Sequence, residues 1–221
     1  MGLLAFTACQ SGTSQATLDT NDQKASYGIG YQLGGQLTPA QSHLDLDALL
    51  MGIRDGMEGS EPTLAVTDIQ VAMNAMNTAV QEEETTRRTA EAEKNASEGA
   101  SFLAENAQKE GVQVTESGLQ YEVLRDGDGA SPTEDDRVSI HYRGTLIDGT
   151  EFDSSYGGNP ASFAVGGVID GFSEGLQLMT VGSQYRFVIP AEMGYGSQGS
   201  GRDIGPNATL IFEVELLEIL D

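Results

Sequence analysis

The segment 67–109 most constrains how this chain can fold, because it contains no proline and only one glycine, Gly99. Its first apolar side chains recur on one face of a helix, at Ile69, Met73, Met76 and Val80. Beyond Val80 it is rich in Ala, Glu, Gln, Lys and Arg, so it cannot bury much of itself. The pattern predicts a long helix over 67–111 that connects two domains as an exposed rod, with Gly111 placed to end it.

Residues 22–66 alternate helical signals with breaks. The clearest helix there follows Asp45 or Asp47, either of which can cap it. Its apolar side chains recur at helical spacing, at Leu46, Leu49, Leu50, Ile53 and Met57. Together with the glycine-rich stretch around Tyr31, they need a partner surface that so short a domain can hardly provide. We therefore expect a helical domain over 22–66 and a homodimer formed by residues before about Val80.

The pattern changes at residue 112, where alternation of apolar and polar side chains replaces the helical period. Strands are predicted at 118–124, 138–142, 163–165, 185–189 and 210–219. Turns are predicted at Asp126-Gly-Asp-Gly and Asp148-Gly149, and one short helix at 172–179. Many strands with one helix predict an α+β domain over 112–221, in which an antiparallel sheet wraps around that helix.

Five blocks of this domain occur in the order found in one known family. They are Val138-Ser-Ile-His-Tyr142-Arg-Gly144, Asp148-Gly-Thr-Glu-Phe152-Asp153, Val168-Ile169-Asp-Gly171-Phe172, Val188-Ile-Pro190-Ala-Glu-Met-Gly-Tyr195-Gly196 and Gly205-Pro206-Asn-Ala-Thr209-Leu-Ile-Phe212. This part resembles the FKBP-type peptidyl-prolyl cis-trans isomerases, the family that binds tacrolimus and rapamycin. Segments 27–34 and 46–56, with the long helix, look like the N-terminal domain of two-domain bacterial members of the macrophage infectivity potentiator type. In those proteins the N-terminal helices intertwine two chains.

The resemblance implies cis–trans isomerisation of X–Pro bonds without a metal, a cofactor or a covalent nucleophile. Partial double-bond character makes this rotation slow, with a barrier of ~18–20 kcal/mol. At mid-rotation the amide loses resonance and its carbonyl becomes less polar. An apolar, water-poor cavity with a few fixed hydrogen bonds therefore favours that state over the planar amide.

The resemblance also implies which residues would carry this chemistry. Four would act in catalysis: Asp153, Tyr195, Tyr142 and Ile169. Asp153 would orient the amide electrostatically, Tyr142 would wall the pocket, and the Tyr195 hydroxyl and the Ile169 N–H would donate to the carbonyls of the substrate.

Six further residues would bind the proline ring and its neighbours. They are Phe152, Phe163, Val168, Phe172, Ile204 and Phe212. Phe172 would form the floor, where most members of the family have a tryptophan, and this departure changes the depth of the pocket.

Two other functions, a hydrolase and a chaperone-like clamp, also have some support in the sequence. Gly171-Phe-Ser173-Glu-Gly175 matches the G-x-S-x-G pattern of hydrolases, but both histidines, His43 and His141, precede Ser173, and that pattern expects its base downstream. A hydrolase is therefore disfavoured. The alternative that stays open is a dimeric chaperone-like clamp, whose arms hold unfolded chains and whose isomerase pocket is incidental.

The net charge and the N-terminal sequence limit which partners and which location are expected. A net charge of −23 argues against nucleic acid and anionic membrane surfaces. The apolar run before Cys9 resembles the end of a bacterial lipoprotein signal, although no Lys or Arg precedes it, so residues 1–21 are expected to be a signal remnant and a flexible tether. We expect a periplasmic protein, held at the outer membrane through a lipid on Cys9, that acts on proline-containing unfolded or nascent envelope proteins and binds ligands of the tacrolimus and rapamycin type.

Overall fold

The computed structural model of the protein describes residues 17–220. The predicted lipidation site, Cys9, lies outside the described residues. Contacts divide the chain between Glu83 and Glu84, which gives an N-terminal unit that ends at Glu83 and a C-terminal unit that begins at Glu84. Among the described residues, no helix is long and apolar enough to cross a membrane.

The N-terminal unit is helical, as the sequence predicts. It contains α1 (Asn21–Leu37), η1 (Thr38–His43), α2 (Leu46–Glu58) and the first part of α3 (Val66–Asn106). A reciprocal cap starts α1, because Gln23 N donates to Thr20 Oγ1 at 3.2 Å and Thr20 N donates to Gln23 Oε1 at 3.0 Å. Asp45 caps α2, as expected, by accepting from Ala48 N at 2.9 Å.

Helices α1 and α2 bury none of their own side chains. Large apolar groups lie exposed on them, among them Tyr31 (74%) and Met57 (85%). Polar contacts instead join η1 to α3, where Glu83 Oε2 accepts from Ser42 Oγ at 2.9 Å and lies 3.0 Å from His43 Nε2. Hydrogen bonds from these two side chains lower the pKa of the Glu83 carboxyl. The described helices α1, η1 and α2 thus form no buried hydrophobic core among themselves.

Helix α3 differs from the predicted rod in its end and in its exposure. It stops at Asn106, where residues 107–109 form a turn that is closed by the hydrogen bond from Lys109 N to Asn106 O at 3.0 Å. Its C-terminal half belongs to the C-terminal unit and packs against the rest of that unit, with Gly99 and Asn106 buried. The rod is therefore exposed only in part. Phe102 and Leu103 are the apolar residues that mark this contact in the sequence and are partly buried, whereas the two buried positions, Gly99 and Asn106, are small or polar and show no hydrophobic period.

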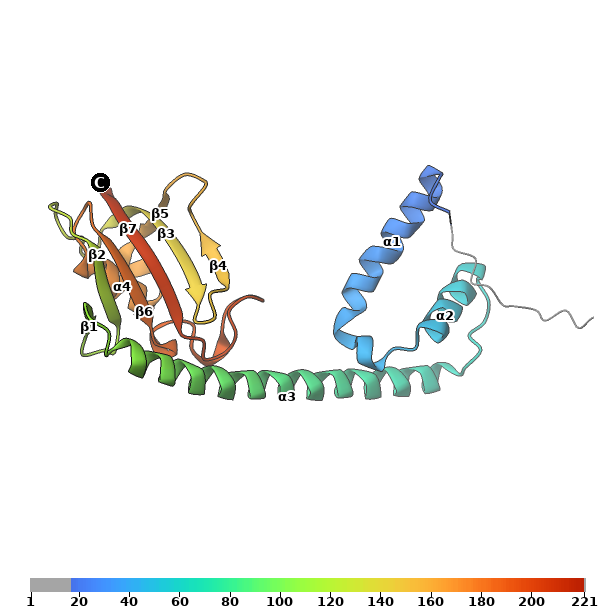
Figure 1. The fold of residues 1–221 in the computed structure, drawn as a ribbon. Coiled ribbons are helices and arrows are strands. Elements are labelled where there is room, and N and C mark those ends of the chain that lie inside the picture. Colours follow the sequence, from blue (N-terminus) through green and yellow to red (C-terminus); the bar gives the residue numbers. More distant parts are fainter. Residues whose placement is uncertain (1–16, 221) are drawn as a thin grey trace, which may run out of the picture. The chain divides into compact units, whose positions relative to one another are not determined.

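The C-terminal unit is built on one antiparallel sheet, and the predicted α+β fold is confirmed (Figure 1). Its strands are β1 (Val112–Val114), β2 (Gln120–Arg125), β3 (Arg137–Leu146), β4 (Glu151–Ser154), β5 (Ala161–Ala164), β6 (Gln184–Ile189) and β7 (Leu210–Leu220). The order across the sheet is β1-β2-β6-β7-β3-β4, and β5 also pairs with β3. The short helix α4 (Asp170–Leu178) packs across one face of this sheet.

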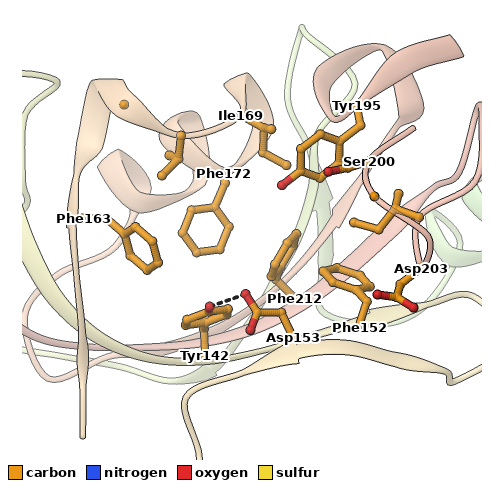
Figure 2. Close-up of a pocket in the computed structure, with 14 residues that line it drawn as sticks. Tyr142, Phe152, Asp153, Phe163, Ile169, Phe172, Tyr195, Ser200, Asp203 and Phe212 are labelled. Atoms are coloured by element: carbon orange, nitrogen blue, oxygen red, sulfur yellow. Dashed lines mark hydrogen bonds between the residues drawn. The ribbon is translucent and has the colours of Figure 1, made fainter. Parts of the chain in front are cut away.

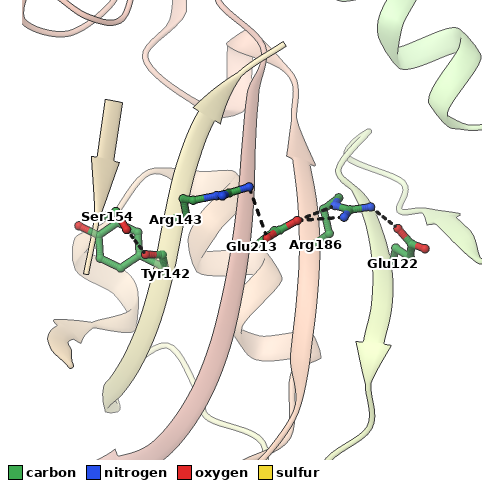
Figure 3. Close-up of polar contacts among 6 residues, drawn as sticks. All are labelled: Glu122, Tyr142, Arg143, Ser154, Arg186 and Glu213. Atoms are coloured by element: carbon green, nitrogen blue, oxygen red, sulfur yellow. Dashed lines mark hydrogen bonds and ion pairs between the residues drawn. The ribbon is translucent and has the colours of Figure 1, made fainter. Parts of the chain in front are cut away.

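The two faces of the sheet differ in chemistry because side chains alternate along each strand. One face, with α4, forms the core around Phe187, Val214 and Leu176, each fully buried. The other face carries charges. There Arg186 bridges Glu122 and Glu213, with 2.9 Å between nitrogen and oxygen in each ion pair (Figure 3). The strands therefore fix which side chains of β3 and β7 face α4.

Candidate functional site

A cavity of about 610 Å³ opens between the sheet and α4 in the C-terminal unit (Figure 2). All ten residues predicted from the sequence line it: Tyr142, Phe152, Asp153, Phe163, Val168, Ile169, Phe172, Tyr195, Ile204 and Phe212. Four further lining residues were not predicted, namely Gly167, Ser200, Gly201 and Asp203. The structure brings the predicted set together in one place, and the part that each residue plays in catalysis stays a prediction.

Strand alternation and one helix place these side chains. Tyr142 on β3 and Phe212 on β7 lie on the face of the sheet toward α4, because their neighbours in sequence point to the charged face. The edge strands β4 and β5 bring Phe152 and Phe163 to the rim. Val168 and Ile169 precede α4, and Phe172 lies in its first turn.

Aromatic rings form the floor and the walls. The Phe172 ring is 4% exposed, and its centroid lies 4.8 Å from that of Phe212 in an edge-to-face contact. Tyr142 meets Phe163 edge to face at 5.6 Å, and Phe152 meets Phe212 in the same way at 5.5 Å. Phe172 also contacts the core ring of Phe187, with 6.2 Å between centroids. Edge-to-face packing holds these rings in fixed orientations, so the cavity wall is preformed.

One hydrogen bond dominates the polar side of the cavity. The Tyr142 hydroxyl donates to Asp153 Oδ2 at 2.5 Å, and Ser154 N donates to Asp153 Oδ1 at 2.9 Å. Burial of the phenol, followed by the adjacent Asp153 carboxylate, raises the pKa of Tyr142 well above its usual value. Tyr142 is therefore a neutral donor at physiological pH, and the carboxylate is held at the edge of the cavity.

Two donors at the cavity have no hydrogen-bond acceptor among the described residues. One is the hydroxyl of Tyr195, a residue that is 39% exposed. The other is the N–H of Ile169, whose carbonyl oxygen accepts from the N–H groups of Phe172 and Ser173, each at 3.0 Å. In Figure 2 the side chains of Tyr195 and Ile169 lie on the same side of the cavity. These two groups can donate to carbonyl oxygens of a bound peptide.

Neither the serine of the hydrolase pattern nor His141 lines the cavity. Ser173, the serine of the G-x-S-x-G pattern, does not line it and accepts a hydrogen bond from Gln177 Nε2 at its carbonyl oxygen. His141 Nδ1 lies 3.0 Å from Ser155 Oγ, and its ring stacks on Tyr156. Among residues 17–220 no group of three or more metal-ligating side chains comes together. An aromatic cavity with few donors matches the requirements of amide rotation.

Sequence reasoning did not single out one glycine at the back of the aromatic wall. Gly144 on β3 pairs with Asp153 on β4 and with Phe212 on β7, so both neighbours across the sheet belong to the cavity. The residue lay within a matched block, but nothing in its type showed that rings would cover it. Ser200, Gly201 and Asp203 come from an irregular loop, for which no periodicity exists.

Comparison with known proteins agrees with this geometry. Residues 129–217 match the family model described as "FKBP-type peptidyl-prolyl cis-trans isomerase". Residues 22–123 match the model of the domain amino-terminal to that isomerase domain. Together these two matches span both units, so the family resemblance extends well beyond the cavity.

Individual relatives are similar over nearly their whole length. The chain is 48% identical over 206 residues to the FKBP-type 22 kDa peptidyl-prolyl cis-trans isomerase of Escherichia coli strain K12, and this covers 92% of the chain and 98% of that protein. It is 37% identical to the outer membrane protein MIP of Legionella longbeachae, over 98% of the chain and 93% of that protein. The crystal structure of FkpA from Escherichia coli superimposes with a TM-score of 0.70 at 35% identity, covering 92% of the chain and 98% of that structure. The chain therefore belongs to the FKBP-type peptidyl-prolyl cis-trans isomerases.

Proposed function

We propose that the aromatic cavity isomerises X–Pro bonds without covalent chemistry. The observation that carries this proposal is the combination of a preformed aromatic cavity with two free donors, the Tyr195 hydroxyl and the Ile169 N–H. The proline ring packs on the floor made by Phe172, and the carbonyls on either side of it accept from the two donors. The planar amide loses solvation on entry, whereas the twisted amide has less to lose, so the barrier falls.

The Tyr142–Asp153 pair supplies the electrostatic part of the proposal. The hydrogen bond from Tyr142 keeps the Asp153 carboxylate in a single orientation beside the cavity. A fixed negative charge acts on the carbonyl dipole that turns during rotation, and no solvent has to reorganise for it. Asp153 is thus proposed to orient the amide, while Phe152, Phe163 and Phe212 exclude water.

The clients that we propose are proline-containing unfolded or nascent proteins of the bacterial envelope. A location in the envelope is supported by the relative named outer membrane protein MIP. The same cavity is proposed to bind ligands of the tacrolimus and rapamycin type, as the family resemblance implies. The net charge of −23 favours clients that are neutral or basic.

A homodimer formed by the N-terminal unit completes this proposal. Its support is the exposed apolar surface of α1 and α2, on which Tyr27, Ile29, Tyr31, Leu46, Leu50, Met51 and Met57 are all at least half uncovered. Exposed apolar surface on this scale marks an interaction site. The same surface favours a second candidate function, a chaperone-like clamp that holds unfolded chains directly.

Two substitutions at the cavity test the catalytic proposal. Tyr195→Phe and Asp153→Ala should lower kcat/KM on X–Pro peptides by about tenfold each, the effect of losing one oriented interaction of ~1.4 kcal/mol. The thermal midpoint of Tyr195→Phe should stay close to that of the unchanged protein, because Tyr195 is exposed, whereas Asp153→Ala should lower the midpoint because it removes the acceptor of the buried Tyr142 hydroxyl. Ser173→Ala is the control and should keep full activity. Full activity of both cavity variants would refute the assignment.

A further inference from the structure

Within the C-terminal unit, the part of α3 from Glu84 onward forms an interface with the sheet and its loops that includes several hydrogen bonds. At its end, Asn106 Nδ2 donates to Gln120 Oε1, and Gln120 Nε2 donates to Leu103 O, each at 2.9 Å. Gly99, which precedes Asn106 on the same helix, lies close to Thr209. A Cβ on this glycine would come within 2.5 Å of Thr209 Oγ1. This part of the interface anchors the helix to the sheet.

The other part of the interface holds a loop of the cavity. Three hydrogen bonds join α3 to residues 196–208, which we call the cavity loop. Arg88 Nη2 donates to Gln198 O at 2.6 Å, and Asn95 Nδ2 donates to Pro206 O at 2.9 Å. In the opposite direction, Asn207 Nδ2 donates to Ala92 O at 3.3 Å. The bonds from Arg88 and Asn95 thus reach both ends of the loop.

The cavity loop supplies one side of the site. It carries Ser200, Gly201, Asp203 and Ile204, all of which line the cavity, and it directly follows Tyr195. Its own structure consists of the short 3-10 helix η4 (Gly196–Gln198), an isolated bridge between Ser200 and Ile204, and a hydrogen bond from Asn207 N to Gly196 O at 2.9 Å that joins its two ends. Asn207 has a left-handed backbone at φ 55°, a conformation that asparagine adopts more readily than most other non-glycine residues. The loop has no regular strand or long helix between Gly199 and Asn207, so contacts from outside it can restrict its conformations further.

The fit between loop and helix is close. A Cβ on Gly205 would lie 2.4 Å from Glu91 Oε1 and 3.0 Å from Asn95 Nδ2, so the loop backbone lies directly on the side chains of α3. Arg88 and Asn95 are seven residues apart, which places both on the same face of the helix, toward the loop. Close packing and two hydrogen bonds therefore act on the same segment.

We propose that Arg88 and Asn95 are positioning residues for the isomerase site. They hold the cavity loop against α3, so that Ile204 and the adjacent Tyr195 are in place before a client binds. Without them the loop samples other conformations, and the binding-competent one is only partly populated, which weakens apparent affinity by that fraction. The proposal rests on the proposed function of the cavity, and it extends the site to a helix that the cavity itself does not include.

The test uses full-length variants that remove one donor each. Arg88→Gln replaces the guanidinium group with a shorter amide and so removes the donor to Gln198 O. Asn95→Asp keeps the shape of the side chain but cannot donate to Pro206 O. For both, KM on X–Pro peptides should rise about threefold to tenfold, as expected for one lost hydrogen bond, while kcat changes much less. Hydrogen exchange at the amides of Ser200 and Ile204 should speed up by a similar factor, because these amides close the bridge in the loop. Arg88→Lys restores a donor and should recover most of the loss.

Two controls separate positioning from general stability. Arg87→Gln removes the neighbouring arginine, which bonds no atom of the loop and reaches it only through its ion pair with Glu91, so it should change KM and the exchange of Ser200 less than Arg88→Gln does. Asn106→Ala removes a buried hydrogen bond of the same interface, so it should lower the thermal midpoint at least as much, yet leave KM and the exchange of Ser200 unchanged.

The outcomes distinguish the two proposals. If Arg88→Gln and Asn95→Asp match the unchanged protein, or match Asn106→Ala in every readout, the positioning role is refuted. If exchange in the loop speeds up but KM stays the same, the loop is held by α3 without serving binding, and the role is again refuted. Failure of the proposed function would show instead as full activity of Tyr195→Phe and Asp153→Ala.

Discussion

Gly144 lies directly behind the ring of Phe152, so that a Cβ on the glycine would come within 2.5 Å of Phe152 Cε2. The same atom would lie 2.9 Å from Phe212 Cε1. Neither distance is tolerated between carbon atoms, and both rings belong to the cavity wall. The absence of a side chain at residue 144 is what allows the rings to lie against the sheet.

Gly144→Ala should therefore displace the aromatic wall of the cavity and lower both stability and activity. The added methyl group forces Phe152 and Phe212 outward, which we expect to cost about 1–3 kcal/mol of stability through overpacking. The displaced rings should also lower kcat/KM on X–Pro peptides by about tenfold or more, because a small misplacement of cavity groups is costly. Peptide kinetics and urea unfolding measure the two effects. Gly158→Ala, where a Cβ would meet nothing closer than 3.7 Å, is the matched control and should change neither. Full activity of Gly144→Ala would contradict this account.

Tyr142 should make stability depend on alkaline pH. Burial, and then the Asp153 carboxylate, raise the pKa of its phenol in the folded state, whereas the unfolded phenol titrates near 10. Below that pH both states are protonated and the contribution to stability is complete. Above it the unfolded state loses its proton first, so the free energy of unfolding falls as pH rises, by up to about 1.4 kcal/mol per pH unit.

Urea unfolding at a series of pH values from about 9 to 11 compares the unchanged protein with Tyr142→Phe. The variant should lose stability less steeply, since it lacks this phenol. Tyr156 and Tyr185, whose pKa values are also raised by burial, are present in both proteins and cancel in the comparison. Asp153→Asn should keep part of the slope, because burial is the larger cause. Equal slopes for Tyr142→Phe and the unchanged protein would rule out this effect.

The proposed homodimer predicts that Gly30→Ala changes stability in opposite directions in a monomer and in a dimer. Within a single chain, a Cβ on Gly30 of α1 meets no atom within 4 Å, so Gly30→Ala should stabilise an isolated helix by about 1 kcal/mol. If the glycine-rich face packs against a second copy, the added methyl group should weaken the dimer instead. Ile29→Asp, at an apolar side chain that is 68% exposed, should do so more strongly. Light scattering at micromolar concentration reports the state. A monomeric unchanged protein would exclude the dimer.

The contacts of α3 change where the chain should be cut to separate its functions. A chain that begins at Glu84 keeps Arg88, Asn95 and Asn106, and we expect it to isomerise short X–Pro peptides within about twofold of the full-length protein. The same cut should slow the proline-limited refolding of a whole protein much more, because a long client can contact both arms of a dimer and gains effective concentration from them. Peptide and refolding assays per active site compare the two forms.

A chain that begins at Gly111 serves as the second comparison. It lacks the partners of Gln120 and of the cavity loop, so it should be less stable than the chain from Glu84 and have a higher KM. Equal refolding rates for the full-length chain and the chain from Glu84 would assign the N-terminal unit to anchoring or spacing alone.

The sequence predicted the sheet and the cavity wall well because both follow local patterns. Val138, Ile140 and Tyr142 alternate with more exposed residues, and in the structure their side chains are buried on one face of β3. The matched blocks then identified the aromatic residues other than Phe163, although those blocks lie on β3, β4, β6 and β7, at the start of α4 and on the adjoining loops. The order of the blocks along the chain was enough to group these residues, without any knowledge of the distances between their side chains.

The sequence predicted less where contacts join residues that are far apart in the chain and follow no helical or strand periodicity. The interface of α3 depends on Asn95, Gly99 and Asn106, which no hydrophobic pattern marks. Helix α1 is continuous, although four glycines at 28, 30, 34 and 35 suggested breaks, each at a helical cost of about 1 kcal/mol. The short edge strand β4 was not predicted as a strand, because four half-exposed residues carry little alternation.

The Phe172 ring belongs to two structures at once, since it meets Phe212 at the cavity and Phe187 in the core. The melting temperature of this protein should therefore respond directly to whatever occupies the cavity, without any label or enzymatic assay. A compound that fills the cavity supports the same ring that the fold rests on, and it raises the midpoint in proportion to the logarithm of its concentration over Kd. The same sharing restricts variation, because a residue at 172 that deepens the cavity also removes packing from the sheet. Affinity and fold stability are thus linked through one side chain.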